Sequence, residues 1–326
     1  MQKTQKRTIA VLDLGTNTFR ILLAQPHRKF LFKALYEEKV YVRIAKTGID
    51  YIGQAAYRRA LEAMERFEKI IKKHNVTEVY AFATEGMRRA SNSEQLIAEV
   101  KARYGISIRR ISGDMEATFI YHGVQQVFDL GTHPHLLMDI GGGSTEFIIA
   151  NATQIFWKQS FAIGGTVLKQ QFHQQEPLSP QDLEVLINHL NQVLLPFWKA
   201  AKKFGTIDTL VGTSGTFSSI NKMAAAAASL TLSPEQHIYP IQLTTATALA
   251  EHLLHTTLEE RLSVPGLEPE RAELISVAFI LVQLVLERLH ISHLFYSSYA
   301  IKEGILWYVF KHPQLMEKEG LSFHID

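Results

Sequence analysis

The feature that most constrains the fold is a pattern that occurs twice in the chain. Each copy leads from an apolar run through an Asp-x-Gly turn and small hydroxyl residues into a second apolar run, at residues 11–24 and 137–150. This order predicts a β-hairpin. Glycine in such a turn lets consecutive backbone N–H groups approach an anion without a Cβ in the way. The repeat therefore predicts two related halves with phosphate-binding loops on either side of a shared active-site cleft.

The predicted phosphate ligands of these two turns are the small residues that follow each aspartate. They are Gly15, Thr16, Asn17, Gly141, Gly142, Gly143 and Ser144.

Length and composition describe an ordinary globular protein. The chain has 326 residues, which favours about two domains. Apolar residues make up 46%, and a net charge of +2 gives no indication of a nucleic-acid partner. The absence of cysteine excludes disulfides and thiolate chemistry. The N-terminus is neither a signal peptide nor a membrane span, so we expect a cytoplasmic protein without a membrane partner.

The predicted elements alternate between strand and helix, which indicates parallel pairing and an α/β fold. In the first half, strands are predicted at 30–44, 79–83 and 106–111, and helices at 54–74, 93–104 and 115–128. In the second half, a strand is predicted at 209–211, and helices at 179–204, 270–289 and 301–310. The second hairpin begins near residue 131, where we place the domain boundary.

A third Gly/Ser/Thr cluster, at 212–216, lies between a predicted strand and a helix. Exposed N–H groups and the helix dipole favour an anion there. A single cluster of this kind is as often a simple turn, but three in order favour phosphate. No P-loop or Gly-x-Gly-x-x-Gly motif occurs, and no Gly-x-Ser-x-Gly motif indicates an acyl-transfer serine. The predicted phosphate ligands of this third loop are Gly212, Ser214, Gly215 and Thr216.

Four carboxylates lie in or beside these loops: Asp13, Asp139, Glu116 and Glu146. Acids near a polyanion repel it unless a cation intervenes, and Mg²⁺ binds carboxylates together with phosphate oxygens. Asp13, Asp139 and Glu146 are the predicted metal ligands. Glu116 or Glu146 can position or deprotonate the attacking water. Alternatively, the aspartates only cap their turns, and Glu116 only interacts with a helix dipole.

Positive charge near the loops comes from arginines. A guanidinium holds two phosphate oxygens at once, and Arg20, Arg43 and Arg88 lie close to the predicted loops. Arg20 and Arg88 are therefore predicted phosphate ligands. The 14 histidines show no spacing that is typical of a metal site.

Taken together, these segments resemble the exopolyphosphatase and guanosine pentaphosphate phosphohydrolase (Ppx/GppA) family in its short, two-domain form. The string Asp-Ile-Gly-Gly-Gly-Ser-Thr-Glu is the most specific match. The matching segments follow the family order and are 13–17, 83–92, 111–117, 139–146, 212–216 and 264–267 with Arg271.

The resemblance implies a duplicated actin-like, sugar-kinase-like (ribonuclease H-like) fold with an active-site cleft between two domains. In that fold the last helix returns to the first domain. The implied domains are thus 1–130 with about 306–326, and 131–305.

The resemblance also implies roles for individual residues. Glu116 and Glu146 correspond to the catalytic glutamates of the family, Asp139 to its metal-site aspartate and Arg88 to a phosphate-contacting arginine. The family uses Mg²⁺ and water to remove a terminal phosphate from inorganic polyphosphate or pppGpp.

The chain departs from the family pattern in three places. Met115 stands where the family usually has an acid, and residues 297–304 only loosely follow Gly-Leu-Arg-Glu-Gly. The chain also stops at Asp326 without the helical domain of the longer members, so we expect little processivity on long polymers.

The leading hypothesis is a Mg²⁺-dependent phosphohydrolase that acts on terminal phosphates of polyphosphate, pppGpp or both. One alternative is a non-catalytic sensor that binds polyphosphate or guanosine tetraphosphate, and another is an ATP-dependent small-molecule kinase of the same fold. The sequence does not decide between polymer and nucleotide, because a basic channel and a base pocket depend on tertiary geometry. The apolar C-terminal helices are compatible with a homodimer.

Overall fold

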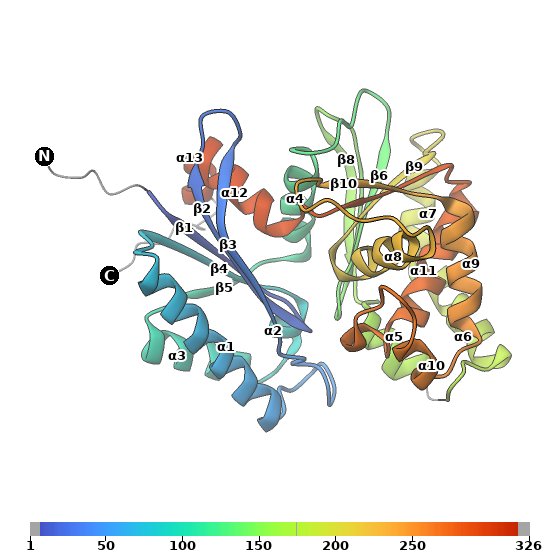
Figure 1. Ribbon diagram of the computed structural model, residues 1–326, viewed down its shortest axis with the longest axis horizontal. Coiled ribbons are helices and arrows are strands. Elements are labelled where there is room, and N and C mark those ends of the chain that lie inside the picture. The colour runs from blue at the N-terminus through green and yellow to red at the C-terminus, as the bar shows by residue number, and fades with distance from the viewer. Residues whose placement is uncertain (1–6, 174, 319–326) are drawn as a thin grey trace, which may run out of the picture. The chain divides into compact units, whose positions relative to one another are not determined.

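The computed structural model describes residues 7–173 and 175–318, and its chain forms two compact units. Unit 1 comprises the described parts of 1–123 and 301–326, and unit 2 comprises those of 124–300 (Figure 1). The sequence placed these divisions near residues 131 and 306. The final eight residues of the predicted C-terminal segment lie outside the described part of the chain.

A five-stranded sheet forms the centre of unit 1, with the strand order β3-β2-β1-β4-β5 (Figure 1). The first three strands pair antiparallel, and β4 and β5 pair parallel. In β1 every residue except Asp13 is buried, as expected for a central strand that is covered on both faces. The strands are β1 (Ile9–Leu14), β2 (Thr18–Pro26), β3 (Phe32–Tyr41), β4 (Glu78–Ala83) and β5 (Ile108–Arg110).

The helices of unit 1 bury apolar side chains against this sheet. Leu12 and Leu14 of β1 join a core with Met64 and Phe67 of α1. Successive side chains of a strand alternate between faces, so Asp13 points away from this core, and α12 contacts β1. The helices are α1 (Gln54–Lys73), α2 (Glu85–Arg89), α3 (Ser93–Tyr104), α4 (Gly113–Val124), α12 (Ile301–Lys311) and α13 (Pro313–Lys318).

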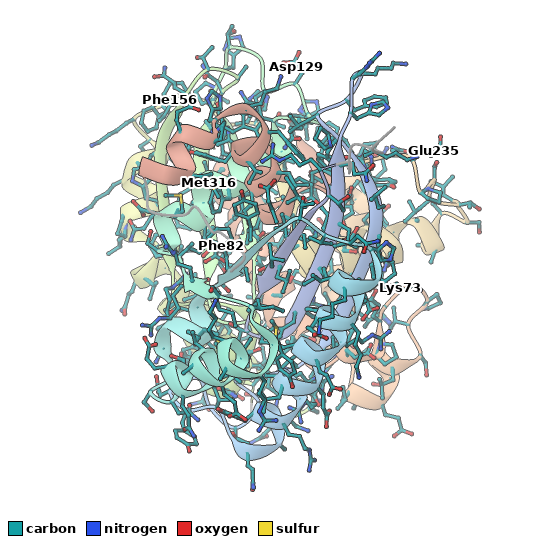
Figure 2. The ribbon with its side chains drawn as sticks, turned by 90° about the vertical axis from the view of Figure 1, so that its left-hand side faces the viewer. Lys73, Phe82, Asp129, Phe156, Glu235 and Met316 are labelled. Carbon is teal, nitrogen blue, oxygen red and sulfur yellow. The ribbon has the colours of Figure 1, made fainter. Side chains whose placement is uncertain are left out.

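An aromatic pair anchors α4 within unit 1. Phe82 of β4, which Figure 2 labels, packs against Phe119 of α4 with ring centroids 5.7 Å apart. The contact fixes α4 relative to β4, and therefore fixes the residues of its first turn.

A six-stranded sheet forms the centre of unit 2, with the order β10-β11-β9-β6-β7-β8. From β8 to β11 it repeats the order of unit 1, with a three-stranded antiparallel meander followed by two parallel strands. This repetition confirms the predicted duplicated α/β fold of actin-like type. The strands are β6 (His135–Ile140), β7 (Thr145–Ala150), β8 (Ile155–Phe161), β9 (Thr209–Thr213), β10 (Ile238–Ile241) and β11 (His293–Ser297).

Aromatic side chains fill the core of unit 2. Phe147 of β7 packs against Phe197 with ring centroids 4.5 Å apart, and Phe217 and Phe279 join the same core. The helical elements are α5 (Gly165–Phe172), α6 (Pro180–Val193), α7 (Leu195–Ala201), α8 (Ser214–Ala227), α9 (Leu243–Leu254), α10 (Leu258–Leu262), the 3₁₀ turn η1 (Pro269–Arg271) and α11 (Ile275–Leu289).

Two predicted helices of unit 2 were wrong in extent. The helix predicted at 179–204 is divided into α6 and α7, because Pro196 has no N–H group to continue the helical hydrogen bonds. The helix predicted at 270–289 begins only at Ile275, after the separate turn η1. Within the described part of the chain, no helix combines the length and apolarity that a membrane span requires.

Candidate active site

The first hairpin turn is closed by its own backbone. Gly15 N–H donates to the carbonyl of Thr18 at 3.0 Å, and a Cβ at Gly15 would lie 3.1 Å from that oxygen. The carbonyls of Thr16 and Asn17 accept hydrogen bonds of 2.9 Å from the N–H groups of residues 42–44. These bonds explain why β3 stops at Tyr41 rather than extending to residue 44 as predicted, and they place Arg43 in the segment that supports the turn.

The second hairpin turn repeats this closure. Gly141 N–H donates to the carbonyl of Ser144 at 2.9 Å, and a Cβ at Gly141 would again lie 3.1 Å from the oxygen. Here the supporting segment is the start of α5. The carbonyls of Gly141 and Gly142 accept bonds of 2.9 Å from residues 165 and 166, and that of Gly143 accepts one of 3.3 Å from residue 164.

The hydrogen bonds from α5 to the carbonyls of the second turn also fix the direction of its N–H groups. In a trans peptide the N–H group points opposite to the preceding carbonyl. The N–H groups of Gly142, Gly143 and Ser144 therefore point away from α5, and no backbone carbonyl of residues 7–173 or 175–318 accepts a hydrogen bond from them. A run of such amides is an anion-binding arrangement.

The third predicted loop lies beside the second turn in unit 2. Thr213 pairs in register with Asp139 on the adjacent strand, and the hydroxyls of Thr213 and Ser214 donate to Asp139 Oδ2 at 2.7 and 2.6 Å. Ser214 has a left-handed φ of 63°, which costs about 1 kcal/mol. The bond to Asp139 holds this conformation, so one carboxylate connects the two loops.

Arg271 contributes a guanidinium to the third loop. A Cβ at Gly215 would lie only 1.8 Å from Arg271 Nη2, so the glycine makes room for the arginine beside the N-terminus of α8. Arg271 is 8% exposed. Sequence reasoning noted this residue only as part of the family match and assigned it no role, because its partner lies far away in the chain.

Gly212 has a packing explanation. It lies within β9, in register with Met138 and Tyr296 on the neighbouring strands, and a Cβ would lie 2.0 Å from the ring of Phe217. Its small size therefore accommodates the core aromatic. Thr216, by contrast, directs its hydroxyl to the carbonyl of Ile140 at 3.4 Å, beside the second turn.

Glu146 and Asp139 form a carboxylate pair. They face each other in register across β6 and β7, and both are buried, with Glu146 1% exposed. Ser160 of β8 donates a hydrogen bond of 2.6 Å to Glu146 Oε1. Two buried carboxylates on one sheet face repel unless a cation or a proton intervenes.

The metal-binding capacity of this pair is limited. No group of three or more acidic, histidine or cysteine side chains in the described ranges could hold a metal ion on its own. Two carboxylates that complete their shell with water and substrate phosphate oxygens are the donor set that Mg²⁺ commonly uses. The pair fits Mg²⁺ rather than a metal that needs a full protein cage.

Glu116 and Arg88 meet in unit 1. Glu116 lies in the first turn of α4 and is 5% exposed, and Arg88 Nη1 donates to its Oε2 at 2.9 Å. Arg88 also binds Glu85 Oε2 and the carbonyl of Ile111, at 2.9 and 2.7 Å. Burial lowers the pKa of the Arg88 guanidinium, but the carboxylates of Glu116 and Glu85 raise it on balance, so the side chain remains charged.

The first turn also contacts the helix that carries Arg88. The N–H group of Gly86 donates to Thr16 Oγ1 at 3.1 Å, and a Cβ at Gly86 would lie 3.0 Å from the same oxygen. Asp13 pairs in register with Arg20 across β1 and β2. In unit 1, the first turn thus contacts α2, the helix that carries Arg88. In unit 2, Asp139 and Glu146 lie beside the second turn and the third loop.

Most of the chain matches one known protein family. A family model described as the Ppx/GppA phosphatase family matches residues 23–312. The crystal structure of an exopolyphosphatase from Cytophaga hutchinsonii is 36% identical, covers 93% of this chain and 98% of its own, and superposes with a TM-score of 0.89.

Two more distant relatives also match most of this chain. A guanosine-5'-triphosphate,3'-diphosphate pyrophosphatase of Vibrio vulnificus is 27% identical over 91% of this chain, which spans 58% of that protein's length. A Ppx/GppA family member from Aquifex aeolicus is 22% identical, with a TM-score of 0.77 over 96% of this chain and 99% of its own, and shows the fold alone.

Proposed function

Because the chain belongs to the Ppx/GppA phosphatase family, we propose that it is a Mg²⁺-dependent phosphohydrolase that releases the terminal phosphate of inorganic polyphosphate, with pppGpp as a second substrate. The observation that carries the proposal is the second hairpin turn. Its three carbonyls are bound to the start of α5, so the N–H groups of Gly142, Gly143 and Ser144 are aligned for an anion beside the carboxylates of Asp139 and Glu146.

Phosphate binding in unit 2 combines three positive features. The amides of the second turn supply hydrogen-bond donors, the N-terminus of α8 supplies the positive end of a helix dipole, and Arg271 supplies a guanidinium beside Gly215. A phosphate bound by all three is both oriented and partly neutralised.

Asp139 and Glu146 are the residues that would hold Mg²⁺. The hydroxyls of Thr213 and Ser214 orient Asp139, and that of Ser160 orients Glu146. When bound, Mg²⁺ would neutralise the carboxylates and polarise the phosphoryl oxygens. Asp13, which holds the equivalent strand position in unit 1, is a further proposed ligand.

Glu116 is the proposed base for water. Arg88 holds its carboxylate at Oε2, in a fixed orientation at the first turn of α4. In the proposed step a water oxygen bonds to the terminal phosphorus in line, the bond from that phosphorus to the bridging oxygen breaks, and Glu116 accepts the water proton. The products are inorganic phosphate and a chain shortened by one phosphate.

The test is phosphate release by the purified protein from polyphosphate and pppGpp at matched phosphate concentration. We expect release with Mg²⁺, none after chelation by EDTA, and a large loss in Glu146→Gln. Tight binding of either compound without release would instead favour a sensor. Transfer that requires an added small-molecule acceptor would favour a kinase.

A further inference from the structure

Arg88 of α2 lies between two glutamates. Its Nε and Nη2 atoms lie 2.9 and 2.8 Å from Glu85 Oε2, whereas Nη1 donates to Glu116 Oε2 at 2.9 Å. The three side chains are largely buried, with exposed fractions of 19% for Arg88, 15% for Glu85 and 7% for Glu116. The proposed hydrolysis step uses Glu116 as the base and leaves Glu85 without a role.

The shape of the guanidinium makes these contacts interdependent. A guanidinium is a rigid, planar fork, so the position of its Nε–Nη2 edge determines where Nη1 points. Glu85 binds that edge of Arg88 through one carboxylate oxygen. Nη1 is thereby directed to Glu116 and to the carbonyl of Ile111, 2.7 Å away, which lies between β5 and the start of α4.

Close packing fixes the helix that carries the pair. A Cβ at Gly86 would lie 2.9 Å from Ile44 Cδ1, and Met87 is fully buried. Residues three apart on a helix are neighbours on its surface, so Glu85 and Arg88 face each other along α2. The backbone therefore keeps the two side chains within reach of each other.

The next residue of α2 forms a similar pair that is exposed. Arg89 donates from Nε and Nη2 to Asp50 Oδ1 at 3.2 and 2.7 Å, and the Asp50 side chain is 77% exposed. Exposed pairs of this kind contribute little to stability. The pair of Arg88 differs because it is largely buried and because the same guanidinium also holds Glu116.

We propose that Glu85 is a positioning residue, which holds Arg88 so that the guanidinium fixes the Glu116 carboxylate in the orientation needed to accept a proton from water. The inference rests on the proposed function, because it takes Glu116 as the base. It assigns Glu85 no contact with substrate. It requires only that Arg88 holds one side of the Glu116 carboxylate, whatever else that carboxylate contacts.

The test compares Glu85→Ala and Glu85→Gln with wild type in phosphate release from tripolyphosphate at fixed Mg²⁺. We expect Glu85→Ala to lower kcat roughly tenfold, because misorientation of a catalytic group acts chiefly on kcat. KM should not rise, since the change removes a negative charge near a polyanionic substrate. Glu85→Gln keeps an acceptor oxygen for Arg88, so it should retain more of the activity.

Asp50→Ala is the matched control, because it removes the partner of the neighbouring Arg89. Both kinetic constants should remain unchanged in this variant. If Glu85→Ala does not fold, Glu85→Gln alone is informative, through a fall in kcat that the control does not show.

A double variant tests whether Glu85 acts through Arg88. Glu85→Ala combined with Arg88→Ala should be no slower than Arg88→Ala alone, because the arginine that Glu85 holds is already absent. A further fall in kcat in the double variant would overturn the inference. An unchanged kcat with a lower KM in Glu85→Ala would also overturn it, since Glu85 would then only compete with substrate for Arg88.

A crystal structure of Glu85→Ala separates this inference from the proposed function. We expect the guanidinium of Arg88 to leave its position, and the 2.9 Å contact with Glu116 to be lost. A contact that persists in the variant would overturn the inference. A wild type that releases no phosphate would contradict the hydrolase proposal, whereas the crystal structure would still show whether Glu85 holds Arg88 against Glu116.

Discussion

The first hairpin opposes Asp13 to Arg20 across β1 and β2, whereas the second opposes Asp139 to Glu146 across β6 and β7. The turns between these strands close in the same way, through glycine N–H bonds of 3.0 and 2.9 Å to the residue three positions later. At this register position the duplicated backbone thus carries an acid opposite a base in one unit and two acids in the other. We infer that the first hairpin contributes chiefly to anion binding, whereas the second binds an anion at its turn and a cation at its pair of acids.

The supports of the two turns differ as well. Residues 42–44, in the irregular segment after β3, support the first turn, whereas the start of α5 supports the second through residues 164–167. A helix N-terminus presents several N–H groups on one side, so it binds three consecutive carbonyls of residues 141–143 and aligns the amides that follow them. This difference makes the second turn the more complete anion-binding loop.

The largest expected effect concerns the acid that distinguishes the second hairpin. Glu146→Gln should lower kcat on polyphosphate by about 10³-fold, because it removes a charged ligand or base while it keeps the shape of the side chain. Steady-state kinetics and a thermal melt check this expectation. If a folded variant kept activity within tenfold of wild type, the acid pair of the second hairpin would not be needed for catalysis.

A smaller effect is expected from the basic member of the first hairpin. Arg20→Gln should raise KM roughly tenfold and change kcat much less, since a guanidinium on phosphate contributes chiefly to binding. The comparison is made under the conditions used for Glu146→Gln. A fall in kcat as large as that of the glutamate variant would remove the distinction between the two hairpins.

The helical support of the second turn can be tested through stability. A Cβ at Gly164 would lie 2.4 Å from the carbonyl carbon of Gly142, whereas one at Gly165 would meet its nearest atom at 3.6 Å. We expect Gly164→Ala to lower the free energy of unfolding by about 2–3 kcal/mol and Gly165→Ala by less than about 0.5 kcal/mol. Equal urea midpoints for the two variants would show that the turn is not fixed by α5.

The smallest effect tests the likeness of the two turns. Gly15→Ala and Gly141→Ala each place a Cβ 3.1 Å from a carbonyl oxygen, so each should destabilise the protein by about 1 kcal/mol. Chemical denaturation of both variants measures the difference between them. A gap of several kcal/mol would show that the turns are less equivalent than their hydrogen bonds indicate.

Local features of the fold could be predicted from the sequence. Both hairpins and the third loop depend on turn residues and apolar runs within a few positions of one another, and the structure contains all three. Pro196 was also a local signal for the break between α6 and α7, but the continuous helical pattern around it favoured a single helix. Short strands such as β10 and β11 carry too few residues for a clear periodicity.

Contacts between distant residues could not be predicted in this way. The sequence named Arg88 and Glu116 separately, but only the packing of α2 and α4 brings them to 2.9 Å. The approach of Arg271 to Gly215 and the contact of the buried Lys302 with Glu37 likewise depend on how elements far apart in the chain pack. The two residues of such a pair are not separated by any characteristic number of positions, so no sequence pattern indicates the contact.

The most direct test of the central claim is a crystal structure with Mn²⁺ in place of Mg²⁺ and with phosphate bound, in which anomalous scattering locates the metal. We expect the metal within bonding distance of the Asp139 and Glu146 carboxylates, and a phosphate on the amides of Gly142, Gly143 and Ser144. A metal bound elsewhere, or a phosphate that does not contact this turn, would contradict the assignment of the second hairpin.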